Sequence, residues 1–296
     1  MAALRRIEAL REKLRTLGLR PAVAMAAHNP LSAKLVAEAA GFDAIWASGF
    51  ELSASYAVPD ASIISPSTHL EMTRAMGEVQ SLPIIADLDT GFGNAVNLAY
   101  AIPKYEAAGV AAIVIEDKTF PKDSSLRVDG RQSLVSIPEF QGKITAAKNL
   151  GSMLVFARTE ALIAGLGQAE ALKRGLAYVE AGADAILIHS KQKTPDEILE
   201  FCRAWPNKVP LIIVPTSYPQ LSFEEISTLT QGKVRLVICG NHSIRTITTA
   251  LRRTFKQILQ EGGIAGVESE IAPVRDVFNL QGDAGMKELE DKYLLK

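Results

Sequence analysis

The chain is poor in cysteine: its 296 residues contain two, Cys202 and Cys239. Neither belongs to a CxxC motif or to a cluster of cysteine and histidine, which argues against a disulfide framework and against a structural zinc site. An excess of one charge is lacking too, since 32 Lys and Arg face 33 Asp and Glu and give a net charge of −1. The basic residues are scattered along the chain, so neither nucleic acid nor an anionic membrane is an expected partner.

Long hydrophobic runs are also missing. No apolar stretch approaches the roughly 20 residues that a membrane-spanning helix needs, and residues 1–15 have a charged helical pattern that differs from a signal peptide. No GxGxxG motif follows an apolar run, so nothing supports a dinucleotide site. The few cysteines and the missing membrane segment predict a protein of the reducing cytoplasm.

What the sequence does contain is a series of eight short apolar runs separated by amphipathic helical stretches. Runs that are apolar on both faces are typical of strands buried in a parallel sheet. Glycines such as Gly41, Gly109 and Gly182 precede several runs and suit helix C-caps. The eight predicted strands are Ala22–Ala27, Ala44–Ala47, Ile84–Leu88, Ala112–Ile115, Leu154–Ala157, Ala185–Ile188, Leu211–Val214 and Leu236–Cys239.

Polar residues follow nearly every run, for example His28, Asp89, Arg158 and His189. In a barrel the carboxyl ends of all strands meet on one face, where active sites lie, whereas a doubly wound sheet would concentrate such residues at one switch point. The sequence therefore predicts an α/β fold, a (β/α)₈ TIM barrel, that forms a single domain over residues 1–296.

Two segments are left over from the eight strand–helix units. A helix over 4–17 precedes the first strand, and residues 243–296 form a C-terminal helical extension with an apolar pattern that includes Ile271, Val274 and Phe278. Exposed apolar positions on a helix that leaves a barrel favour docking on a neighbouring subunit. Folding back onto its own barrel is the alternative, and the sequence leaves both open.

Three carboxylates are the first candidates for chemistry. Asp87 and Asp89 lie two residues apart at a strand end, so they point to the same side, and Glu116 ends the next strand. Carboxylates gathered at a barrel mouth are costly unless a cation, a proton or an arginine compensates them. Such an oxygen-rich set suits Mg²⁺ with several bound waters. Caps and salt bridges are the structural alternative.

Other strand ends carry groups that could bind an anionic substrate. Ser48 and Gly49 follow the second strand and offer a hydroxyl and backbone N–H groups. Arg158 offers a planar fork for a carboxylate or a phosphoryl group, and His189 can donate a hydrogen bond. The segment Glu116–Leu126 is too polar for a packed helix and is interpreted as a lid, with an ordinary exposed loop as the alternative.

With these motifs in view, the sequence resembles the phosphoenolpyruvate mutase/isocitrate lyase superfamily over nearly its whole length, from about Ala22 to Leu294. Its most specific segments are WASGFELSA (46–54), DLDTGFGN (87–94), EDKTFPK (116–122) and GADAILIHS (182–190). The resemblance implies a small α-keto acid or its enolate, bound to Mg²⁺ at the barrel mouth. It implies that Asp87 binds the metal directly, while Asp89 and Glu116 hold it through water; Mn²⁺ or Co²⁺ are other possible metals.

The lid distinguishes the branches of this superfamily. Carbon–carbon lyases carry a catalytic cysteine there, in a Lys-Lys/Arg-Cys-Gly-His motif, whereas this chain has Lys122, Asp123, Ser124, Ser125 and Leu126. The lid instead resembles that of the branch acting on carbon–phosphorus bonds. At the position of Ser124 the mutases have Asn and the hydrolysing members have Thr. The hydrolysing members also share the spacing SLRVDGR (125–131) and the segments ELSASYAVPD (51–60) and HSKQKTPDEIL (189–199).

The resemblance thus implies Mg²⁺-dependent hydrolysis of the carbon–phosphorus bond of phosphonopyruvate to pyruvate and phosphate. The alternatives are the mutase reaction between phosphoenolpyruvate and phosphonopyruvate, a carbon–carbon lyase and, from another class, a keto-acid-binding barrel without catalysis. A homotetramer or homodimer with exchanged helices is expected. The expected catalytic residues are Asp60, Lys122, Ser124, Arg158 and His189, and the expected substrate-binding residues are Trp46, Ser48, Gly49, Phe50, Ser125 and Asn241.

Overall fold

The computed structural model describes residues 2–127 and 129–294. Residue 1, residue 128 of the SLRVDGR motif and residues 295–296 of the expected C-terminal extension lie outside this description. Eight parallel strands follow one another around a closed barrel, in which β8 pairs with β1, so the predicted (β/α)₈ architecture is confirmed. The strands are β1 Ala22–Ala27, β2 Ala44–Ala47, β3 Ile84–Asp87, β4 Ala112–Glu116, β5 Leu154–Thr159, β6 Ala185–Ile188, β7 Leu211–Ile213 and β8 Val234–Cys239.

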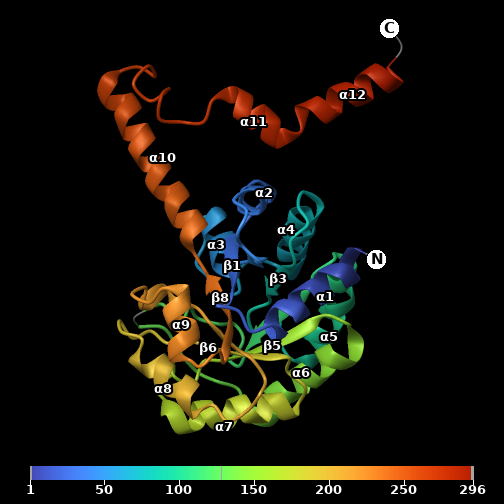
Figure 1. Cartoon of the computed structure of the whole chain (residues 1–296), viewed down its shortest axis with the longest axis vertical. Coiled ribbons are helices and arrows are strands. Elements are labelled where there is room, and N and C mark those ends of the chain that lie inside the picture. Colours follow the sequence, from blue (N-terminus) through green and yellow to red (C-terminus); the bar gives the residue numbers. More distant parts are fainter. Residues whose placement is uncertain (1, 128, 295–296) are drawn as a thin grey trace. The chain divides into compact units, whose positions relative to one another are not determined.

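Helices surround the strands, as Figure 1 shows for α5–α9. Several begin at polar N-caps that accept backbone N–H groups, among them Asn29, Ser65 and Ser136. Those of the barrel are α1 Ala2–Arg15, α2 Pro30–Glu38, α3 Gly49–Ser55, α4 Pro66–Glu78, α5 Ala95–Ala107, α6 Ile137–Leu150, α7 Gly167–Glu180, α8 Asp196–Ala204, the 3₁₀ turn η1 Pro215–Ser217 and α9 Phe223–Leu229.

The strand ends differ slightly from those predicted, and the difference affects the site. β4 and β5 extend one and two residues further, to Glu116 and Thr159. The parallel register then pairs Glu116 with Arg158. Ladder hydrogen bonds on both sides of a central strand fix such positions, so these two polar residues lie on rigid backbone rather than on loops.

Alternation along the strands creates two apolar layers. Side chains such as Trp46, Val114 and Phe156 fill the barrel interior, while those of opposite parity pack under the helices. Ile7, Leu10 and Leu14 of α1 belong to the interior layer together with residues that begin strands. The N-terminal helix therefore closes the end of the barrel opposite to the strands' carboxyl ends.

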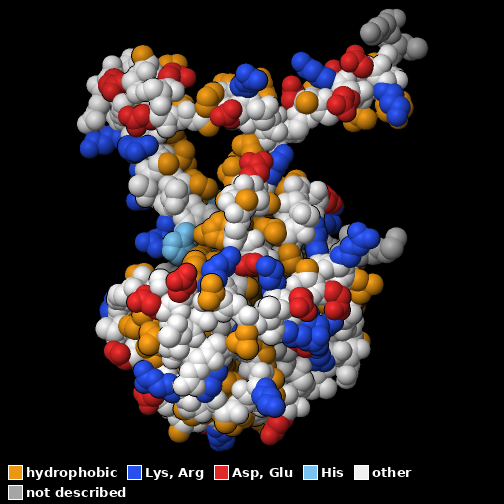
Figure 2. Space-filling view, viewed as in Figure 1, with side chains coloured by type: hydrophobic (Ala, Val, Ile, Leu, Met, Phe, Trp, Pro, Cys, Tyr) orange, Lys and Arg blue, Asp and Glu red, His pale blue; other side chains and the backbone are white. Residues whose placement is uncertain are grey.

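The chain divides into two compact units, Met1–Ser243 and Ile244–Lys296. Helix α10 His242–Glu261 leads into the second unit, which also contains α11 Val274–Gln281 and α12 Asp283–Tyr293. In the described residues no helix combines the length and the apolarity that crossing a membrane requires. On the face of the first unit seen in Figure 2, acidic and basic side chains are interspersed.

Candidate active site

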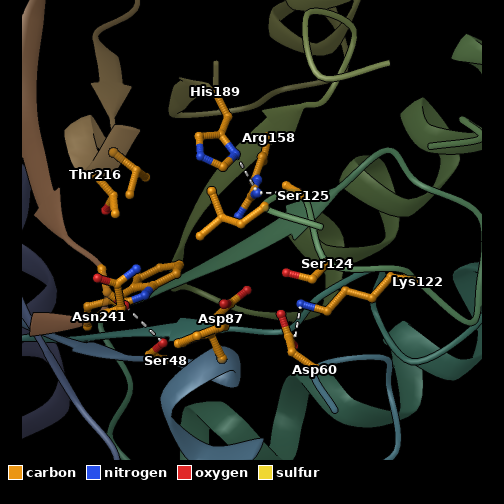
Figure 3. Close-up of a pocket in the computed structure, with 15 residues that line it drawn as sticks. Ser48, Asp60, Asp87, Lys122, Ser124, Ser125, Arg158, His189, Thr216 and Asn241 are labelled. Carbon is orange, nitrogen blue, oxygen red and sulfur yellow. Dashed lines mark hydrogen bonds and ion pairs between the residues drawn. The ribbon is translucent and has the colours of Figure 1, made fainter. Parts of the chain in front are cut away.

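A cavity opens at the carboxyl ends of the strands, and side chains from six of the eight strand ends and from the lid line it. Figure 3 shows them pointing toward a common centre. Most of the residues expected to bind substrate or to take part in catalysis are among its lining. The lining consists of Trp46, Ser48, Phe50, Asp60, Asp87, Lys122, Ser124, Ser125, Leu126, Arg158, His189, Val214, Thr216, Gly240 and Asn241.

Asp87 ends β3 and directs its carboxylate into this cavity (Figure 3). Two backbone N–H groups lie near it at long distances: that of Gly49 at 3.3 Å from Oδ2 and that of Asp89 at 3.4 Å from Oδ1. Burial raises the pKa of both Asp87 and Asp89, even though Lys122 acts in the opposite direction. A buried carboxyl such as Asp87, with a raised pKa and weak hydrogen bonds, favours a cation beside it.

The charge of Lys122 already lies inside the cavity. Its Nζ is 2.9 Å from Asp60 Oδ1 and 2.6 Å from Asp89 Oδ1, and the side chain is 6% exposed. Burial lowers the pKa of Lys122, but the carboxylates of Asp60, Asp89 and Glu116 outweigh that and raise it well above its ordinary value. This lysine is therefore a fixed positive charge, and the lid that carries it covers the cavity.

The expected metal ligands are arranged so that few of them could contact a metal ion directly. In the described part of the chain no three His, Cys, Asp or Glu side chains come together as a metal-binding group. Within the same residues, Glu116 Oε1 is buried and has no hydrogen-bond partner, a condition that calls for an unseen ion or water. The donor set fits a hard cation that binds one carboxylate, that of Asp87, and keeps several waters.

Arg158 and His189 form the opposite wall. Arg158 Nε lies 2.5 Å from Glu160 Oε1 and 3.3 Å from Glu116 Oε2, and its Nη2 lies 2.9 Å from His189 Nδ1. Burial and the neighbouring Arg158 lower the pKa of His189, so the ring is neutral. Since a guanidinium can only donate, His189 Nδ1 accepts and its proton is on Nε2. The wall presents donors to a bound anion.

The turn after β2 begins the short helix α3. Ser48 Oγ accepts the N–H of Glu51 at 3.1 Å as the N-cap and donates to Gly240 O at 3.3 Å. A Cβ atom on Gly49 would lie 3.1 Å from Asp89 Oδ1, so a larger residue would crowd the acidic residues. Phe50 lies in the first helical turn, where backbone N–H groups have no partner within the helix.

Three expected residues do not line the cavity. Gly49, Asp89 and Glu116 lie behind its wall, where each contacts a lining residue: Asp87, Lys122 and Arg158, respectively. Ser125 lines it, but its hydroxyl is already used by Lys118, Arg158 and Glu160.

Sequence reasoning missed Lys118 and Glu160, and it also missed Thr216, which lines the cavity. Lys118 and Glu160 are buried to 1% and 0% exposure, and each comes two residues after a recognised candidate, Glu116 and Arg158. Alternation beyond a strand end was the signal that could have found them.

Comparison with known proteins agrees with this geometry. The family model for phosphoenolpyruvate phosphomutase matches residues 10–259. A phosphonopyruvate hydrolase of Variovorax sp. (strain Pal2) is 63% identical over 274 residues, 92% of this chain and 93% of the relative. A phosphoenolpyruvate phosphomutase of Tetrahymena pyriformis is 43% identical over 273 residues, 91% of this chain and 90% of the relative.

Solved structures give the same result. The crystal structure of a phosphonopyruvate hydrolase in complex with oxalate and Mg²⁺ has a TM-score of 0.91 and 58% sequence identity, and the match covers 98% of this chain and 99% of that one. By its fold, its sequence and the family model, this chain belongs to the phosphoenolpyruvate phosphomutase family.

Proposed function

We propose that the protein hydrolyses the carbon–phosphorus bond of phosphonopyruvate, in a Mg²⁺-dependent reaction that gives pyruvate and phosphate. The observation that carries the proposal is the lid: a serine hydroxyl, that of Ser124, faces the cavity where lyases of the superfamily carry a cysteine. The 63% identity to a phosphonopyruvate hydrolase supports it. So does the complex of such a hydrolase with oxalate and Mg²⁺, because oxalate has the paired oxygens of a pyruvate enolate.

Asp87 would hold the metal directly, with Asp89 and Glu116 behind it through water. A Mg²⁺ ion bound there would polarise the ketone and stabilise the enolate charge that develops as the bond breaks. The unpartnered Oε1 of Glu116 and the weak contacts of Asp87 support this assignment among the described residues. The turn at Ser48–Phe50 binds the carboxylate end of the substrate, with Trp46 and Asn241 beside it.

The phosphonyl group lies between the walls formed by Arg158, His189 and Lys122. In the described contacts Arg158 uses Nε and Nη2, which leaves Nη1 for an oxygen of the substrate, and His189 donates from Nε2. Transfer of a phosphoryl-like group needs mainly positioning and charge stabilisation. A water oxygen attacks phosphorus, the bonding pair passes to carbon as the enolate, and a proton then adds to that carbon to give pyruvate.

The attacking water is positioned by Ser124, and Asp60 takes its proton or acts as a transient acceptor. Asp60 lines the cavity and lies 2.9 Å from the ammonium of Lys122, so the two act together. In a mutase the lid asparagine would shield the phosphonyl group and return it to the enolate oxygen. A hydroxyl at Ser124 leaves space for water.

One incubation tests the reaction. With phosphonopyruvate and Mg²⁺ the protein should release pyruvate and phosphate in equal amounts. Coupled lactate dehydrogenase measures the pyruvate, and a phosphate assay measures the phosphate. Removal of the metal with EDTA should abolish release, and added Mg²⁺ should restore it. Formation of phosphoenolpyruvate without phosphate would instead establish the mutase reaction, as in the 43% identical relative.

We also propose that residues 1–296 act as one barrel domain and that the extension over 243–296 carries a subunit contact of a homodimer or homotetramer. Along α10, Ile247, Leu251, Phe255 and Leu259 recur every four residues and are 36–82% exposed. A helix with one unpartnered apolar stripe favours a partner surface over solvent.

A further inference from the structure

Glu160 is a fully buried carboxylate to which the proposed reaction gives no role. It comes directly after β5 and has 0% exposure. Its backbone N–H donates to Asp117 Oδ1 at 2.9 Å, which fixes the chain at this point. Burying a charged group is costly unless it is fully paired, so its partners explain why it is there.

The two oxygens of Glu160 face two different parts of the site. Oε1 accepts from Arg158 Nε at 2.5 Å and lies 3.3 Å from His189 Nδ1. Oε2 accepts from Ser125 Oγ at 2.6 Å and lies 3.3 Å from Lys118 Nζ. One carboxylate therefore contacts the anion-binding wall on one side and the lid on the other.

On the lid side, Lys118 and Ser125 form the connection. Lys118 Nζ donates to Ser125 Oγ at 2.6 Å and to Asp123 O at 2.8 Å. The backbone of Lys118 is anchored by an isolated bridge to Leu134 at the base of the lid. The lysine thus belongs to the fixed base, while Ser125 belongs to the part that covers the cavity.

The direction of each hydrogen bond follows from the donors present. Lys118 and Arg158 can only donate, and both reach Ser125 Oγ, at 2.6 and 3.0 Å. The serine proton must therefore go to Glu160. Burial raises the pKa of Glu160, but the charges of Arg158 and Lys118 outweigh it and hold that pKa well below its ordinary value. An ionised carboxylate completes the network, whereas an amide would put an N–H₂ group against donors.

We propose that Glu160 is a positioning residue that couples lid closure to the anion-binding wall: through Oε2 it holds the closed lid, and through Oε1 it orients Arg158 and thereby His189. Opening of the lid removes Ser125 from Glu160 and from Arg158 together. Arg158 is then less constrained until the lid returns over a bound substrate. The role of this wall in catalysis rests on the proposed function, but the coupling itself does not.

Two variants separate the two sides of Glu160. Ser125→Ala removes the lid contact and one contact of Arg158 but keeps the hydrogen bond from Arg158 Nε to Glu160 Oε1, whereas Glu160→Gln disturbs both sides. Asp184→Asn is the matched control, since Asp184 holds Lys148 Nζ and the N–H of Val155, each at 2.7 Å, next to the barrel's other end. It removes one hydrogen-bonded carboxylate charge, 26% exposed, without touching the lid.

Three readouts apply to each variant. Trypsin cleavage at Arg127 and Arg131 reports opening of the lid, imidazole ¹⁵N shifts of His189 report the proton position, and kcat reports turnover. We expect trypsin to cleave the lid of both Ser125→Ala and Glu160→Gln about 10- to 100-fold faster than that of the wild type, because each change removes a charged hydrogen bond that holds the lid. The His189 signal should shift more in Glu160→Gln than in Ser125→Ala, and kcat of Glu160→Gln should fall by about 100-fold.

Other outcomes overturn the proposal. If trypsin cleaves the lid of Ser125→Ala at the wild-type rate, the claim that Glu160 holds the lid through Ser125 is contradicted, whether or not Glu160→Gln folds. An unchanged His189 signal in Glu160→Gln contradicts the claim that Glu160 orients Arg158 and thereby His189. Equal acceleration of lid cleavage in Asp184→Asn reduces Glu160 to a general structural role. Cleavage and spectra need no turnover, so a wild-type protein that releases no phosphate from phosphonopyruvate would contradict the proposed function and leave these tests valid.

Discussion

Ser124 and Ser125 are neighbours in the lid, yet their hydroxyls meet different surroundings. That of Ser125 is held by Lys118, Arg158 and Glu160, while that of Ser124 faces the cavity. We predict that Ser124→Asn lowers phosphate release by about 10- to 100-fold, because the amide occupies the position of the attacking water. Ser124→Thr keeps the hydroxyl and should retain most turnover. A coupled phosphate assay at saturating Mg²⁺ measures both, and full activity of Ser124→Asn would refute this role of the lid.

At the scale of single elements, α1 acts as a plug for the barrel. Leu10 is 0% exposed and packs with the interior side chains, whereas Leu4 on the same helix is 57% exposed. Leu10→Ala should lower the free energy of unfolding by about 2–5 kcal/mol through lost burial and a residual cavity. Leu4→Ala should change it little. Urea unfolding measures both values, and kcat of the folded Leu10→Ala enzyme should stay near that of the wild type, because the plug lies opposite the site.

For the whole molecule, the apolar stripe of α10 predicts association. Side chains such as Phe255 along this helix are exposed in the chain. Light scattering after gel filtration should give two or four chain masses for the wild type. The double change Leu251→Asp and Phe255→Asp should shift the measured mass toward that of one chain, because buried carboxylates at a contact are costly. Arg253→Ala, on the opposite side of the helix, is the control, and a monomeric wild type would refute the contact.

The eight strands and their order could be predicted from the sequence because each is a short apolar run between helical stretches. Strand ends were less certain, since Glu116 and Arg158 are polar residues within β4 and β5. Their register pairing gives the polar side chains a rigid position that the apolar pattern does not encode.

The sequence by itself determined the barrel and the face that carries the chemistry, because strand periodicity and the polar strand ends are local signals, and the family resemblance implied several more residues of the cavity. Only the tertiary structure decided which of the three expected metal-binding carboxylates lines the cavity, with Asp87 at its surface and Asp89 and Glu116 behind it. It alone also showed that Ser125 is bound to Glu160 and Lys118. Ser125 and Glu160 are 35 positions apart. Their contact depends on how the strands and the lid pack together, and no local pattern specifies it.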